Sequence, residues 1–280
     1  MRFQREVTAA VLIPAVLAVL VFAPTWAFTL LVAAAAVVAL IEFYALLEAA
    51  GWRIPRTAGV ALFFALLAAA HVASPVGLIA LAGATILALP ALVMFSSASV
   101  GALLPSSAGA VFATLYVALG GGAMIGLRAR GWEPVVFLLA VVWAGDSAAY
   151  YVGRRLGKRK LAPVVSPKKT WEGLWGQLAG GTLFGTCAAA ALSAAGRPSP
   201  GAGTIPAVLA GAILGLLVSV VAVVGDLVES TFKRSVAVKD SGGVLPGHGG
   251  LLDRLDSLLY ASPVLLLALH ALALLPRGPQ

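Results

Sequence analysis

Long apolar runs separated by short polar segments dominate the pattern of this chain. Each run is close to the roughly 20 residues that an α-helix needs to cross a lipid bilayer. Proline and glycine mark many of the breaks, as at Pro24 and at Gly51 before Pro55. The pattern predicts about nine membrane-spanning helices, at residues 7–24, 26–49, 57–74, 76–96, 100–126, 134–152, 173–195, 204–230 and 257–276.

The composition agrees with a membrane protein of the all-α class. Hydrophobic residues make up 61% of the 280 positions and charged residues 11%, whereas a soluble domain has about 25% charged residues. Small residues inside the apolar runs let helices approach closely in lipid; examples are Gly176, Gly180, Gly181 and Gly185. We therefore expect a polytopic transmembrane helical bundle. The third and fourth runs could also form a re-entrant pair, because only two residues separate them.

The basic residues predict the orientation of this bundle. With nine spans and a cytoplasmic N-terminus, all but four of the 19 Lys and Arg residues lie on the cytoplasmic side, as the positive-inside rule requires. The exceptions are Arg128, Arg130, Arg197 and Arg277. Both long polar loops, 153–172 and 231–256, then face the cytoplasm. We expect residues 1–133 to be membrane-spanning helices and residues 134–280 to form a catalytic membrane region.

Charge and motifs exclude several other classes. The net charge of +8 does not indicate a nucleic-acid-binding protein, because the basic residues lie in short loops beside apolar runs. Such loops hold anionic lipid or nucleotide phosphate instead. The single cysteine, Cys187, excludes a disulfide framework. No Cys/His spacing indicates zinc, no Ser/His/Asp order indicates hydrolysis, and the stretch 153–158 lacks the Ser or Thr of a P-loop.

Acidic residues gather in one short part of the chain. They are Asp226, Glu229, Asp240, Asp253 and Asp256. Carboxylates beside a membrane are costly, so they normally face a cavity or one another and mark a functional site. Converging carboxylates suit Mg²⁺, which takes oxygen ligands and commonly bridges protein carboxylates to substrate phosphates. The cluster therefore predicts a magnesium site, although any single member could instead cap a helix.

Basic residues and a glycine-rich turn accompany these carboxylates. Cationic side chains in this position would neutralise phosphates and a leaving pyrophosphate, and glycines let backbone N–H groups approach phosphate oxygens. The candidates are Ser230, Lys233, Arg234, Lys239, His248, Gly249, Gly250 and Arg254.

A second polar patch lies upstream. Asp146 stands inside the sixth apolar run, roughly 9 Å from its cytoplasmic end at the rise of a helix. It is a candidate substrate-binding residue, with an interhelical hydrogen bond as the alternative. The loop 153–172 could hold a triphosphate or a lipid phosphate. Its candidates, with the neighbouring Tyr150, are Ser166, Lys168, Lys169, Thr170 and Glu172. Glu42 and Glu48, in the second run, are expected to extend to the membrane interface.

The motifs resemble those of the phosphatidate cytidylyltransferases, or CDP-diacylglycerol synthases. The longest reads Ser230-x2-Lys233-Arg234-x4-Lys239-Asp240-x-Gly242-x2-Leu245-Pro246-x-His248-Gly249-Gly250-x2-Asp253-Arg254-x-Asp256. The pair Asp146-x3-Tyr150 and the run Ser166-Pro167-Lys168-Lys169-Thr170-Trp171-Glu172-Gly173 are similar to that family in the same order. The resemblance covers about residues 134–260, and no signature position departs from it.

The resemblance implies an enzyme of phospholipid biosynthesis that joins CTP and phosphatidic acid into CDP-diacylglycerol and pyrophosphate. It further implies Mg²⁺, with a second cation such as K⁺ beside it, a homodimer, and an active site on the cytoplasmic face of the bacterial inner membrane. The metal ligands would be Asp226 and Asp253, with Asp256 nearby.

Two alternatives from other classes compete with this interpretation. A transporter of an anionic solute would also use intramembrane carboxylates, but transporters often carry inverted repeats, and no repeat is visible in this sequence. A CTP-using lipid kinase would share the substrates and transfer the γ-phosphate instead. The motif of enzymes that consume CDP-alcohols, Asp-x2-Asp-Gly-x2-Ala-Arg, is absent.

Overall fold

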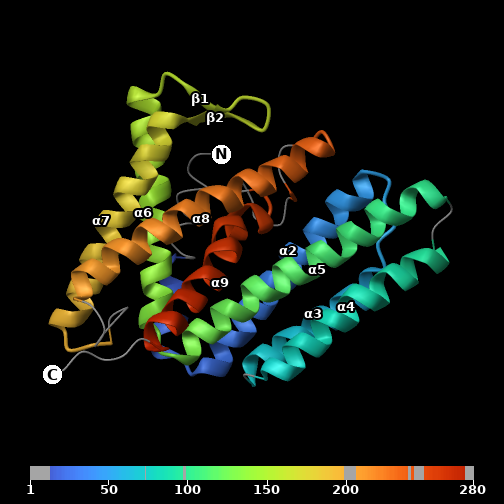
Figure 1. The fold of residues 1–280 in the computed structure, drawn as a ribbon, viewed down its shortest axis with the longest axis horizontal. Helices are drawn as coiled ribbons and strands as arrows, with labels where there is room; N and C mark the ends of the chain where they lie inside the picture. The colour runs from blue at the N-terminus through green and yellow to red at the C-terminus, as the bar shows by residue number, and fades with distance from the viewer. Residues whose placement is uncertain are drawn as a thin grey trace. The chain divides into compact units, whose positions relative to one another are not determined.

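The computed structural model describes residues 13–72, 74–96, 99–198, 206–238, 241–242 and 249–274. Helices make up nearly all of this part of the chain (Figure 1). They are Ile13–Phe22, α2 Thr25–Ala49, α3 Arg56–His71, α4 Pro75–Ser96, α5 Val100–Ala129, α6 Glu133–Leu156, α7 Trp171–Ala194, α8 Ala207–Ser235 and α9 Leu252–Leu274. A helix therefore lies in each predicted apolar run.

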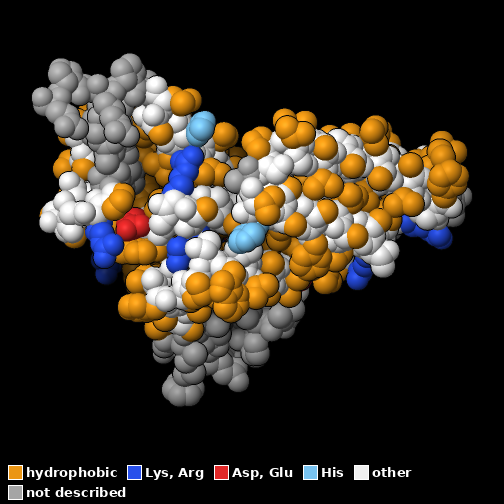
Figure 2. All heavy atoms as spheres, turned by 90° about the horizontal axis from the view of Figure 1, so that it is seen from below, with side chains coloured by type: hydrophobic (Ala, Val, Ile, Leu, Met, Phe, Trp, Pro, Cys, Tyr) orange, Lys and Arg blue, Asp and Glu red, His pale blue; other side chains and the backbone are white. Residues whose placement is uncertain are grey.

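Six helices of the described residues are long and apolar enough to cross a membrane: α2, α4, α5, α6, α8 and α9. Ile13–Phe22 and α3 are shorter. Large hydrophobic side chains are exposed along α4, where Val76, Leu87 and Phe95 are 79%, 74% and 82% exposed. The face drawn in Figure 2 is covered mostly by hydrophobic side chains. Such a surface is stable against lipid rather than water, so the helical membrane class is confirmed, while the number of nine spans stays a prediction.

Two helices extend into the segment that was predicted as the loop 231–256. Helix α8 continues to Ser235, and α9 begins at Leu252. Lys233 and Arg234 therefore lie in the last turn of α8, and Asp253 in the first turn of α9. Opposite charges at these ends suit the helix dipoles, which accounts for helix beyond the apolar run.

The loop 153–172 contains a small antiparallel hairpin that the all-α prediction did not include. Strand β1, Lys160–Ala162, pairs with β2, Ser166–Thr170, with Lys160 opposite Thr170. Thr170 then caps α7, because its Oγ1 accepts a hydrogen bond from the Gly173 N–H at 3.1 Å. The hairpin thus leads directly into α7.

The chain divides into two compact units, and each is described by itself. The first contains the described residues within 1–126 and 231–255, and the second those within 127–230 and 256–280. In the first unit α3 packs against α2 and α4. Tyr44 of α2 hydrogen-bonds Thr114 of α5 at 2.6 Å between their hydroxyl oxygens. Phe232 packs on Phe43 and Phe112, with ring centroids 5.1 and 5.2 Å away, so the segment 231–255 is anchored on α2 and α5.

Small residues make the helix contacts of the second unit, as the sequence predicts. A Cβ added to Gly180 of α7 would lie 2.6 Å from the Cβ of Ala148 in α6. One added to Gly185 would lie 2.7 Å from the carbonyl oxygen of Gly211 in α8. One added to Gly225 of α8 would lie 2.9 Å from the carbonyl oxygen of Asp256 in α9. The helices of this unit therefore meet backbone to backbone.

Candidate active site

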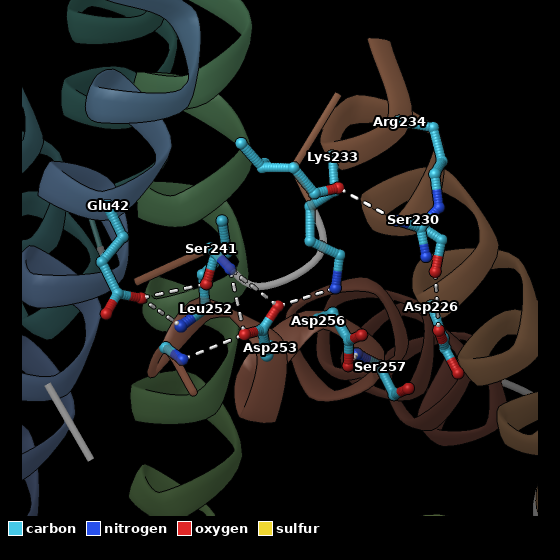
Figure 3. A network of polar contacts seen from close by, with 12 residues as sticks. Glu42, Asp226, Ser230, Lys233, Arg234, Ser241, Leu252, Asp253, Asp256 and Ser257 are labelled. Atoms are coloured by element: carbon cyan, nitrogen blue, oxygen red, sulfur yellow. Dashed lines mark hydrogen bonds and ion pairs between the residues drawn. The ribbon is translucent and has the colours of Figure 1, made fainter. Parts of the chain in front are cut away.

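In the first unit, the site is built around the carboxylate of Asp253 (Figure 3). Its Oδ1 lies 2.7 Å from the Nζ of Lys233. Its Oδ2 accepts hydrogen bonds from the backbone N–H groups of Ser241 at 3.1 Å and Gly250 at 2.9 Å. The side chains of Asp253 and Lys233 are only 9% and 12% exposed. Lys233, Ser241 and Gly250 thus converge on one carboxylate that is largely shielded from solvent.

Arg234, next to Lys233, has a local role. Its Nη1 donates a hydrogen bond to the carbonyl oxygen of Val238 at 3.0 Å, beyond the end of α8. Arg254 is exposed. Gly249 has a φ of 79°, in the left-handed region that favours glycine. Three predicted site residues, Lys239, Asp240 and His248, lie outside the described residues.

In the second unit, the corresponding centre is Asp226 of α8. Its Oδ2 lies 2.7 Å from the Nζ of Lys169, which belongs to β2. Its Oδ1 accepts a hydrogen bond from the Ser230 hydroxyl at 3.3 Å, one turn further along α8. The Asp226 side chain is 38% exposed, so its carboxylate is open to a ligand. The hairpin therefore carries a predicted phosphate-binding lysine to a predicted metal ligand.

Asp146 of α6 joins this centre. Its Oδ1 accepts a hydrogen bond from the Nε2 of Gln177 in α7 at 2.9 Å. Asp226 and Lys169 act on it electrostatically. Gln177 is 7% exposed and was missed in the sequence. The signal was present, because an amide inside an apolar run needs a buried partner. The interhelical hydrogen bond that was the alternative for Asp146 is thus formed.

The remaining candidates of the second unit shape the hairpin or stay exposed. Glu172 accepts hydrogen bonds from the backbone N–H groups of Lys158 at 3.0 Å and Arg159 at 3.3 Å. Its own backbone N–H, and then that of Lys158, hold the pKa of this carboxyl below its usual value. Tyr150 accepts a hydrogen bond from Arg154 at 3.1 Å. Ser166 opens β2, and Lys168 is exposed.

The donor set of the predicted metal site suits a hard cation. No group of three or more His, Cys, Asp or Glu side chains that could hold a metal occurs among the described residues. Mg²⁺, however, commonly uses one or two protein carboxylates and completes its shell with phosphates and water. Asp226 and the buried Asp256 belong to the second unit and Asp253 to the first. The meeting of all three therefore stays a prediction.

Glu42 of α2 corrects the sequence analysis, which expected its side chain at the membrane interface. It is 6% exposed. Its Oε2 accepts hydrogen bonds from the Leu252 N–H at 2.8 Å and the Ser241 hydroxyl at 3.3 Å (Figure 3). The prediction for Glu42 was wrong because the donors that hold it come from a segment distant in sequence. Glu48, one of the same pair, is partly exposed and forms an ion pair with Arg56.

Comparison with known proteins finds bacterial relatives that match about half of this chain and about half of their own length. The chain is 47% identical over 137 residues to the phosphatidate cytidylyltransferase of Brucella suis, which covers 49% of this chain and 47% of the relative. It is 43% identical over 144 residues to that of Bacillus subtilis, covering 50% and 49%. It is 42% identical over 130 residues to that of Pseudomonas aeruginosa, covering 46% and 45%. The matches thus span about half the length of these curated relatives.

A family-level comparison extends over nearly the whole chain. The model of the cytidylyltransferase family matches residues 3–272. This range contains both lysine–carboxylate pairs and Glu42. The chain therefore belongs to the cytidylyltransferase family.

Proposed function

We propose that this protein is a phosphatidate cytidylyltransferase, which transfers CMP from CTP to phosphatidic acid and releases pyrophosphate. The observation that carries the proposal is the pairing of two predicted metal ligands with lysines: Asp226 with Lys169 and Asp253 with Lys233, both at 2.7 Å. Relatives named for this activity match this chain over about half of their own length. Their match to this chain supports the substrates CTP and phosphatidic acid.

The chemistry needs the groups that this site supplies. A phosphate oxygen of phosphatidic acid attacks the α-phosphorus of CTP, a P–O bond forms there, and the bond to the β-phosphate oxygen breaks. Both reactants are anionic, so repulsion must be neutralised, which is mostly a matter of positioning and charge stabilisation. A phosphate monoester is largely ionised at neutral pH, with a second pKa of about 6. No strong general base is therefore required of the protein.

Magnesium is part of the proposal, with Asp226, Asp253 and Asp256 as its ligands and a second cation such as K⁺ beside it. When bound, Mg²⁺ would supply Lewis-acid polarisation and charge neutralisation at the phosphates. The lysines that neighbour the carboxylates, Lys169 and Lys233, would bind phosphate oxygens. Lys239, Arg234, Arg254 and the residues Ser166 to Thr170 would add positive charge and hydrogen-bond donors to the same substrates.

The placement in the membrane is proposed from charge. Nine spans with a cytoplasmic N-terminus put most basic residues inside, next to the nucleotide. The six long apolar helices among the described residues support an integral membrane protein, and the bacterial inner membrane is the location that we propose for it. A homodimer is the assembly that the family resemblance implies.

Labelled CTP tests the proposal directly. Purified protein in detergent is incubated with phosphatidic acid, Mg²⁺ and CTP labelled in either the α- or the γ-phosphate. Label from the α-phosphate should enter lipid, with stoichiometric pyrophosphate release. Label from the γ-phosphate in lipid would instead show a lipid kinase, and no label in lipid would contradict both and favour transport.

Variants of the carboxylates test the roles within the site. Asp226→Asn and Asp253→Asn should each lower CTP-dependent turnover by about 100-fold or more, because each removes charge that positions the phosphates and cation. Glu48→Gln, which changes a carboxylate outside the site, is the control. Near-wild-type turnover in either aspartate variant, with normal expression, would remove that residue from the machinery.

A further inference from the structure

A buried carboxylate of the first unit has no part in the proposed chemistry. Glu42 lies in the C-terminal third of α2 and is 6% exposed. Its neighbours Phe43 and Tyr44 are fully buried against α5 and the start of 231–255. A charged group at this depth is costly unless it makes specific interactions. The contacts of Glu42 therefore indicate what its side chain is for.

Glu42 caps α9 from a distance in sequence of 210 residues. Leu252 is the first residue of α9, and its N–H has no acceptor within the helix, as at every helix start. The Oε2 atom of Glu42 accepts that N–H at 2.8 Å. The same oxygen accepts the Ser241 hydroxyl at 3.3 Å. One carboxylate oxygen thus joins Ser241 and the first residue of α9 to α2.

Ser241 continues the connection to the candidate active site. While its hydroxyl donates to Glu42, its backbone N–H donates to Asp253, at 3.3 Å to Oδ1 and 3.1 Å to Oδ2. Asp253 follows Leu252 directly on α9. Figure 3 shows Glu42 and Asp253 on either side of Ser241. Glu42 therefore reaches Asp253 by two short routes, one through Ser241 and one through the first turn of α9.

Two glycines of the signature make room for this carboxylate. The three atoms nearest to a Cβ added at Gly242 all belong to Glu42, with Oε1 at 2.4 Å and Cδ at 2.7 Å. One added to Gly250 would lie 2.6 Å from Oε2 of Glu42 and 2.0 Å from the Ser241 hydroxyl. Neither glycine has a φ in the left-handed region. The approach of Glu42 thus leaves no room for a side chain at Gly242, and Glu42 and Ser241 together leave none at Gly250.

We propose that Glu42 is a positioning residue for cytidylyl transfer: as a hydrogen-bond acceptor it fixes Ser241 and the first turn of α9, and so orients the carboxylate of Asp253. This inference rests on the proposed function. Positioning of a ligating carboxylate by a neighbour is commonly worth 10- to 100-fold in metal affinity or activity. The acceptor role needs one oxygen and no charge.

Substitutions that separate shape, acceptor and charge test the inference. Glu42→Leu keeps a side chain of similar size and removes the hydrogen-bond acceptor, so kcat should fall about 10- to 100-fold. The KM for CTP should change less than about threefold, because the lost interaction matters in the transition state rather than for substrate binding. Glu42→Gln keeps an oxygen for Leu252 and Ser241 and should hold kcat within about threefold of wild type. Glu48→Leu, on the same helix, is the matched control and should be unchanged. A Gln variant as poor as the Leu variant, or a Leu variant as active as the control, overturns the inference.

Gly242→Ala decides the matter if Glu42→Leu does not fold. The added methyl would displace the Glu42 carboxylate from Leu252, so kcat should fall as in Glu42→Leu, whereas Gly83→Ala should be neutral because nothing lies within 4 Å of its Cβ. A Gly242→Ala variant with wild-type kcat contradicts the proposal.

Amide hydrogen exchange, measured without substrate, distinguishes failure of this inference from failure of the proposed function. Exchange at Ser241, Gly250 and Leu252 should be faster in Glu42→Leu than in Glu48→Leu. If wild type makes no CDP-diacylglycerol but these amides exchange faster in Glu42→Leu, the hydrogen bonds of Glu42 are confirmed, and its catalytic role is rejected together with the proposed function. If wild type is active and neither exchange nor kcat changes, the inference fails and the function stands.

Discussion

Lys233 in the last turn of α8 and Asp253 in the first turn of α9 form an ion pair with 2.7 Å between Nζ and Oδ1. They are 20 residues apart in sequence, and their side chains are 12% and 9% exposed. Because both side chains are shielded from solvent, each charge is tolerated only while the opposite charge lies beside it. The pair therefore holds the Asp253 carboxylate in place at the candidate site.

Breaking this pair should cost stability. Lys233→Met removes the ammonium group that lies 2.7 Å from the Asp253 carboxylate, and removal of one partner of a buried pair costs about 3–5 kcal/mol of unfolding free energy. Lys233→Met with Asp253→Asn should be less destabilised, because both charges are gone. Thermal unfolding of the detergent-solubilised protein measures both. The exposed Arg155→Met is the control, expected within about 0.5 kcal/mol of wild type, and equal losses in the single and double variants would contradict the argument.

The hydrogen bond from Gln177 to Asp146 should contribute to the stability of the protein. Gln177→Leu leaves the Asp146 carboxylate without the 2.9 Å donor. Because the Asp146 side chain is itself exposed, we expect the loss to be about 1 kcal/mol, the net value of a typical hydrogen bond. The double variant Asp146→Leu with Gln177→Leu should recover much of that loss.

Activity separates stability from function in this pair. If Asp146 binds substrate, the double variant should be more stable than Gln177→Leu and still be inactive in the CTP assay. A double variant that is active would remove Asp146 from the site, and one no more stable than Gln177→Leu would show that the hydrogen bond is not what matters.

The backbone contacts of the second unit predict opposite outcomes for two glycines. Gly185→Ala would place a Cβ 2.7 Å from the carbonyl oxygen of Gly211. Because backbone cannot move aside cheaply, we expect a loss of about 1–3 kcal/mol. Gly83→Ala in α4 has nothing within 4 Å and should be neutral or stabilising by up to about 1 kcal/mol. Melting temperatures in one detergent compare the two, and a tolerated Gly185→Ala would contradict the packing.

The stability of the hairpin should depend on pH through Glu172. Backbone N–H donors lower the pKa of this carboxyl from its ordinary value of 4.5. Its contribution to folding stability is therefore fully present above that ordinary pKa and is lost as the pH falls through the lowered pKa of the folded state. Between about pH 5 and pH 3 the melting temperature of wild type should fall more than that of Glu172→Gln. Parallel curves would show that the carboxylate does not stabilise the hairpin.

Much of the fold could be predicted from local pattern. Apolar runs indicated each helix, because burial in lipid depends on the composition of a single segment. The lysines and aspartates of the site could be named from their types and spacing, and Lys169, Asp226, Lys233 and Asp253 are in contact as pairs. The hairpin 160–170 was not predicted, since its strands pair through backbone groups that carry no pattern of their own.

The sequence by itself determined that this is a helical membrane protein whose helices pack through small residues. It also determined that carboxylates and basic residues gather near the ends of some helices. Both follow from hydropathy and residue type, which are properties of each segment alone. Only the tertiary structure decided which cation meets which carboxylate, that Gln177 donates a hydrogen bond to Asp146, and that Glu42 accepts hydrogen bonds from Ser241 and Leu252. Those contacts join residues far apart in the chain, and their energies depend on burial and distance, which exist only once the helices are packed.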